Sequence, residues 1–152
     1  MQVSQLEGES SPKESAVPQA TASGNTVDIE ALTKHLLEET EFDTKLERLE
    51  DSVAEGMVET EKGSRLELYM GSGTSSDELV VITAPDETAA ENNQKAVETH
   101  FKEMKKSFED YIPEQAKKIE NAVIIRCGCY VVACVTKDAD TAREMIVGAF
   151  QK

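Results

Sequence analysis

Apolar residues recur with two different periods along the chain, and these periods predict the order of its helices and strands. At helical spacing, Ile29, Leu32 and Leu36 mark one face of a helix that Thr26 or Asp28 can cap. A second, weaker helical segment follows, and its inward-facing residues are expected to be Phe42, Leu46, Leu49 and Val53.

Alternation with a period of two predicts a first strand at 65–70, in which Leu66, Leu68 and Met70 face the core. The segment 78–84 is apolar on both faces and predicts a second strand. The loop 71–77 between them is too short for a crossover helix, so we expect the two strands to pair antiparallel.

The strongest helical pattern begins after Pro85, with Asp86 as its cap. Its apolar stripe consists of Ala90, Val97, Phe101, Met104 and Phe108. Tyr111 and Ile112 end this helix, and Pro113 suits the first position of a short helix that ends near Glu120.

A second hairpin and a last helix complete the pattern. Strands at 122–127 and 129–135 flank Gly128, which can supply the positive φ of a tight turn. Asp138 or Asp140 is expected to cap the final helix, whose buried face is Ala142, Met145, Ile146 and Ala149.

These elements predict an α+β fold: a two-layer-type sandwich with packed helices and a four-stranded antiparallel sheet built from two hairpins. Three of the strands are apolar on both faces, so we expect helices or a partner to cover both sides, with the helix at 28–39 as the cover of the second face. The residues expected to be buried there are Val80, Ile82, Ile124, Val131 and Ala133.

Residues 1–26 differ in composition from the rest of the chain. They are rich in Ser, Glu, Gln, Ala, Pro and Gly and carry no aromatic residue, which predicts a disordered spacer before a single domain at 27–152. The segment has no basic start and no apolar core of a signal peptide. Its composition resembles the spacer that follows a removed signal, and equally the loose terminus of a cytoplasmic protein.

The charge of the chain makes nucleic acid and anionic membranes unfavourable as partners. With 16 basic and 30 acidic residues the formal charge is −14, which disfavours nucleic acid and anionic membrane surfaces. The longest apolar run is also much shorter than the ~18 residues that a membrane helix needs.

The most site-like stretch is the loop 71–77, whose candidate ligand-binding residues are Ser72, Thr74, Ser75, Ser76 and Asp77. Its glycines and hydroxyls can cradle an anion through backbone N–H groups. A phosphate loop, however, runs into a helix, whereas this one runs into a strand, and Asp77 and Glu78 repel anions. A plain connection between strands is the favoured interpretation.

Histidines and cysteines give no strong signal of a site. His35 and His100 have no ligand at metal spacing and are interpreted as helix-surface or boundary residues. We interpret Cys127, Cys129 and Cys134 as small apolar residues of the second hairpin, with a disulfide or a metal site as the alternatives. No cofactor and no metal are expected.

Several segments resemble an uncharacterised family of small lipoproteins of Gram-positive bacteria, a domain of unknown function. The resemblance covers roughly residues 27–150 and is carried by LYMGSGTSSDELVVI, by SFEDY at the end of the long helix, and by IENAVII before the Gly128 hairpin. It implies an extracytoplasmic protein with a lipid anchor. The first cysteine here is Cys127, so the anchoring cysteine of the family is absent from this chain.

The sequence therefore favours a non-enzymatic, extracytoplasmic interaction or binding module. The expected partner is an unknown protein or cell-envelope component, with no nucleic acid and with membrane contact only through an anchor absent from this chain. A sheet face left bare would serve as the binding surface or as a homodimer contact. The alternatives are an enzyme whose site forms only in three dimensions, using Cys129 or the Asp77 loop, and an acidic adaptor in the cytoplasm.

Overall fold

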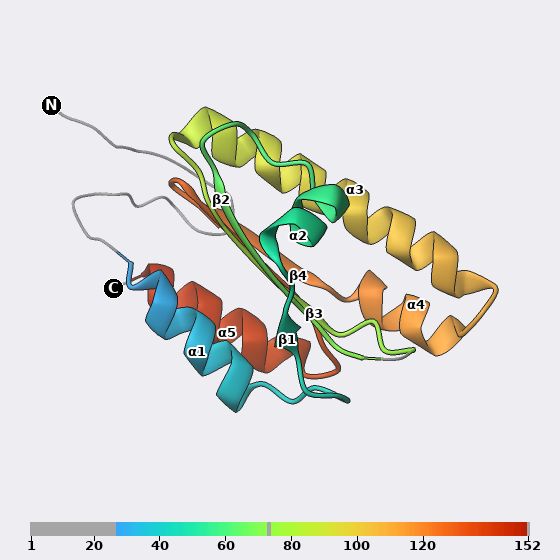
Figure 1. Cartoon of the computed structure of the whole chain (residues 1–152). Helices are drawn as coiled ribbons and strands as arrows, with labels where there is room; N and C mark the ends of the chain where they lie inside the picture. Colours follow the sequence, from blue (N-terminus) through green and yellow to red (C-terminus); the bar gives the residue numbers. More distant parts are fainter. Residues whose placement is uncertain (1–26, 73, 152) are drawn as a thin grey trace, which may run out of the picture.

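A computed structural model describes residues 27–72 and 74–151 and shows an antiparallel sheet with helices on both faces (Figure 1). The spacer predicted at 1–26 lies outside the described residues. The strands are β1 (Glu47–Arg48), β2 (Arg65–Met70), β3 (Glu78–Thr83), β4 (Val123–Cys127) and β5 (Tyr130–Val135), in the spatial order β1-β2-β3-β5-β4. The helices are α1 (Ile29–Glu39), α2 (Asp51–Met57), α3 (Glu87–Glu109), α4 (Pro113–Glu120) and α5 (Ala139–Phe150).

The α+β class and the antiparallel sheet are confirmed, but the described sheet has five strands rather than four, and helices on both faces make three layers rather than two. The additional strand, β1, lies within the segment expected to be a second helix. The chain crosses the sheet edge there, so Leu46 is buried on the α1 side whereas Leu49 packs on the α3 side. Val53 is 50% exposed, so its predicted inward position is wrong.

Both faces of the sheet are covered, as the two-sided strands predicted. Val80, Ile82, Val131 and Ala133 are fully buried in a cluster with side chains of α2, α3 and α4, and Ile124 packs against that cluster. The opposite face, with Leu79 and Val81 among its members, packs against α1 and α5. The helix expected to cover the first group, α1, therefore lies on the other side of the sheet (Figure 1).

Local sequence explains where the main elements begin and turn. Asp86 accepts a hydrogen bond of 2.8 Å from the Ala89 N–H and caps α3. Pro113 begins α4, and Gly128 adopts a φ of +58° in the β4–β5 turn. Asp138 is the N-cap residue of α5, although its side chain makes no capping hydrogen bond.

Candidate functional site

The predicted ligand loop divides into an exposed part and a buried part. Ser72 and Thr74 are exposed, and Ser75 accepts a hydrogen bond of 3.0 Å from the Asp77 N–H. Ser76 is fully buried, and both its N–H and its hydroxyl donate to the side-chain oxygen of Gln115 in α4, each at 2.8 Å. Ligand binding by this loop stays a prediction, and its two buried members already have partners within the fold.

Asp77 is fully buried and joins three segments that are distant in sequence. One carboxylate oxygen accepts from the backbone N–H groups of Asp43, at 2.6 Å, and Thr44, at 3.2 Å. The other lies 2.7 Å from the Lys118 ammonium, which also contacts the Asp43 carboxylate at 2.8 Å. The Lys118 and Lys137 ammonium groups hold the pKa of Asp43 below its ordinary value. This network fastens the loop 71–77 to α4 and to the segment before β1.

Gly71 is packed so closely that it has no room for a side chain. A Cβ at this position would overlap the Thr44 hydroxyl, whose buried oxygen has no hydrogen-bond partner. We expect Gly71→Ala to lower the free energy of unfolding by about 1–3 kcal/mol, because the backbone or Thr44 must move.

Gly56 in α2 provides the matched control for Gly71, because a Cβ there meets nothing within 4 Å. Gly56→Ala is expected to raise the unfolding free energy by up to about 1 kcal/mol, since alanine favours a helix. Urea unfolding of both variants measures the two effects. Equal effects from the two substitutions would contradict the close packing at Gly71.

A second buried polar pair lies on the α3 side of the sheet. His100 Nε2 and one oxygen of Glu78 are 2.7 Å apart, and the side chains are 6% and 0% exposed. The other oxygen of Glu78 is buried with no hydrogen-bond partner. Burial raises the pKa of Glu78, and the contact with His100 opposes this rise. The interpretation of His100 as a surface or boundary residue is therefore wrong.

The cysteines occupy the second hairpin, as expected. Cys127 and Cys134 are buried in strands, whereas Cys129 is half-buried in the turn. Burial, assisted by the nearby Asp77 and Glu78 carboxylates, raises the pKa of the Cys134 thiol far above its ordinary range. Across residues 27–72 and 74–151, no group of three or more His, Cys, Asp or Glu side chains could hold a metal ion.

A groove with a volume of about 360 Å³ lies between α1 and the neighbouring strands β1 and β2. We call it the α1–β2 groove. It is lined by Glu30, Thr33, Lys34, Leu37, Glu38, Arg48, Arg65, Glu67 and Tyr69. Three of these side chains are basic and three are acidic, so the groove is locally neutral within a chain whose formal charge is −14.

Strand alternation and cross-strand pairing build the sheet wall of this groove. Arg65, Glu67 and Tyr69 share one face of β2, and Arg48 lies directly opposite Tyr69 on β1. Glu67 accepts from the Arg65 guanidinium at 2.9 Å and from the Tyr69 hydroxyl at 3.2 Å. Burial and the neighbouring Glu67 carboxylate raise the pKa of Tyr69, so this hydroxyl remains protonated at neutral pH.

The alternation in β2 predicts that Arg65, Glu67 and Tyr69 face away from Leu66, Leu68 and Met70, but it does not predict the groove. The opposing wall comes from α1, about 30 residues earlier in the chain. For the buried pair, a signal existed: His100 continues the apolar stripe of Val97, Phe101 and Met104.

Comparison with known proteins identifies a domain of unknown function, DUF4358, at residues 62–136. This segment runs from just before β2 to just after β5, so α1, α2 and α5 lie outside it. Neither a curated protein nor a solved structure significantly matches the chain. No helix within the described ranges is both long enough and apolar enough to span a membrane.

Proposed function

We propose that this protein is a non-enzymatic, lipoprotein-like binding module that works outside the cytoplasm and holds a polar ligand in the α1–β2 groove. The observation that carries the proposal is the lining of this groove, where basic and acidic side chains of α1, β1 and β2 surround Tyr69. Such a lining suits a ligand that bears charges of both signs, such as a peptide segment.

The positions of the other polar groups support binding rather than turnover. The Asp77–Lys118 and Glu78–His100 pairs are buried and do not line the groove. Their hydrogen bonds connect strands, helices and loops of the fold, so these two pairs serve the structure rather than a ligand in the groove.

Capture from a cell-envelope extract by the immobilised full chain tests the proposal. Arg65 is well exposed, so Arg65→Glu should leave the fold intact while it reverses one charge of the groove wall. Lys95→Glu makes the same charge change at an exposed position of α3 and is the control.

We expect a defined envelope component to be retained by the wild type and by Lys95→Glu, and to be retained at least about tenfold less by Arg65→Glu. Quantitative mass spectrometry of the eluates measures this ratio. A component that the three proteins retain equally would show that the groove is not the binding site. A component released in chemically altered form would favour an enzyme instead.

A separate experiment tests whether the protein lies outside the cytoplasm, in cells that express the natural gene. We expect protease added to intact cells to degrade the protein. Protection in intact cells together with degradation after lysis would favour the cytoplasmic alternative.

A further inference from the structure

The α3 side of the sheet carries a strip of half-buried apolar side chains between α2 and α3. We call it the α2–α3 strip, and its members are Leu49, Met57, Met70, Met104 and Phe108. All five pack against the buried cluster of this face without being fully buried in it. Three of the five methionines of the chain therefore lie in one strip.

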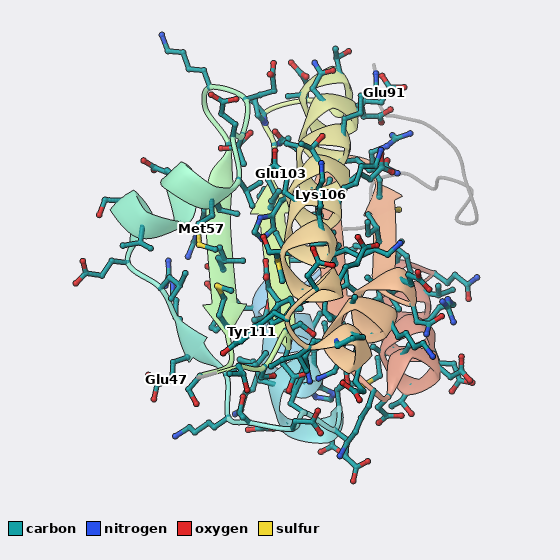
Figure 2. All side chains as sticks on the ribbon, turned by 90° about the vertical axis from the view of Figure 1, so that its right-hand side faces the viewer. Glu47, Met57, Glu91, Glu103, Lys106 and Tyr111 are labelled. Atoms are coloured by element: carbon teal, nitrogen blue, oxygen red, sulfur yellow. The ribbon has the colours of Figure 1, made fainter. Side chains whose placement is uncertain are left out.

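Two exposed apolar side chains extend the apolar surface of α2 and of the chain after α3. Across residues 27–72 and 74–151, the two exposed large apolar side chains are Val53, on α2, and Tyr111, which follows α3 and is 68% exposed. Figure 2 looks onto this side of the molecule and shows Met57 on α2 and Tyr111 below the end of α3. Methionine side chains adapt to the shape of a partner, which suits a docking surface.

Exposed carboxylates border the strip on both sides. Glu47 and Glu50 lie at β1 and just before α2, and Asp51, which pairs with Arg48 at 3.5 Å, begins α2. Glu103 and Asp110 lie on α3 and at its end. Lys106, labelled beside Glu103 in Figure 2, is a cation at this border. The border is thus predominantly negative and complements a positively charged partner.

The way the strands pair determines how a partner can bind here. Glu47 and Arg48 of β1 pair with Met70 and Tyr69, and the Leu49 N–H donates to the Leu68 carbonyl oxygen at 2.8 Å, so this end of the β2 edge is already occupied. A partner at residues 68–70 therefore meets side chains rather than free backbone groups of β2. Half-buried apolar side chains on α2, α3 and the strands between them, with charged borders, suit an amphipathic helix that lays its apolar face on them.

We propose that the α2–α3 strip docks a basic amphipathic helix of a partner protein. The apolar face of that helix covers the methionines and Tyr111, and its basic residues face the acidic borders. A second copy of this chain would bring the same acidic borders together, and an anionic membrane would be repelled. The strip and the α1–β2 groove lie on opposite faces of the sheet, because Glu47 and Met70 alternate with Arg48 and Tyr69. Arg48, which lines the groove, also reaches the Asp51 carboxylate at 3.5 Å around the sheet edge.

Fluorescence anisotropy with the full chain and two labelled 18-residue peptides of leucine and lysine tests the proposal. One peptide places its leucines on one helical face, and the other has the same composition in an order without such a face. We expect the amphipathic peptide to bind at least about tenfold more tightly, and its affinity to fall with added salt. Equal affinity of the two peptides would overturn the proposal, because charge alone would then explain binding.

Three variants locate the binding surface. Tyr111→Ser and Glu103→Lys alter exposed side chains, so both should fold, and each is expected to weaken binding by about five- to tenfold. Glu91→Lys makes the same charge change on the same helix, twelve residues or roughly 18 Å from Glu103, and is expected to change binding by less than about twofold. Equal weakening by the two lysine variants would overturn the proposed location.

The same proteins test the two alternative partners of the strip, a membrane and a second copy of this chain. Binding of the wild type to phosphatidylcholine vesicles but not to the amphipathic peptide would assign the strip to a membrane. A dimer in sedimentation that Tyr111→Ser dissociates would assign it to a second copy. Either result would overturn the proposal of a partner helix.

Discussion

The full chain carrying Asp77→Ala is expected to unfold with a free energy about 3–5 kcal/mol smaller than that of the wild type. The substitution removes the acceptor of the Asp43 and Thr44 N–H groups and leaves Lys118 with only its exposed partner, Asp43. A loss of this size approaches the whole stability of a marginally stable domain. Guanidinium unfolding at neutral pH, followed by circular dichroism, measures it.

Asp140→Ala is the matched control for Asp77→Ala. Asp140 also forms an ion pair, with Arg143 at 3.2 Å, but its side chain is 95% exposed. Solvent screens such a pair, so we expect the unfolding free energy to change by less than about 1 kcal/mol. Similar losses in the two variants would contradict the structural role assigned to Asp77.

The second large effect concerns the buried Glu78–His100 pair. His100→Leu is expected to lower the unfolding free energy by about 3–5 kcal/mol at neutral pH, because Glu78 then has no hydrogen-bond partner for either oxygen. The double variant Glu78→Met, His100→Leu should recover most of this loss, since two apolar side chains of similar size need no partners. If the double variant is as unstable as His100→Leu, the loss comes from packing and the account of the pair is wrong.

The same pair predicts a dependence of stability on pH. Burial raises the pKa of Glu78 in the folded protein above its unfolded value of about 4.3. Its contribution to stability is therefore fully present below about pH 4.3 and is lost as the pH rises through the folded pKa. We expect the wild type to lose stability relative to Glu78→Gln between pH 4 and neutral pH, as urea unfolding at a series of pH values can measure. A constant difference would show that Glu78 has an ordinary pKa.

Elements with a strong local signal could be predicted from the sequence. Asp86 before a long apolar stripe defined α3, and Gly128 between two apolar runs defined the second hairpin. β1 could not be predicted, because two residues carry no periodicity. Leu46 and Leu49 resembled a helical face, but they pack on opposite faces of the sheet.

The polar groups show why candidate sites were harder to predict than the fold. Ser76 and Asp77 belong to a polar loop, and residues of such loops are usually exposed. Both are nevertheless buried, because Ser76 bonds to Gln115 and Asp77 to Lys118, each about 40 residues later in the chain. Such partners meet only in the folded chain. The α1–β2 groove has the same origin, because its two walls come from separate segments.

We propose that the α1–β2 groove binds the ligand and that the loop 71–77 serves the fold. Amide chemical shifts of the ¹⁵N-labelled full chain, recorded while the retained envelope component is added, test this most directly. We predict shifts concentrated at Lys34, Arg48, Arg65 and Tyr69, with Ser72, Thr74 and Ser75 unchanged. Shifts concentrated in the loop 71–77, with the groove unchanged, would contradict the account.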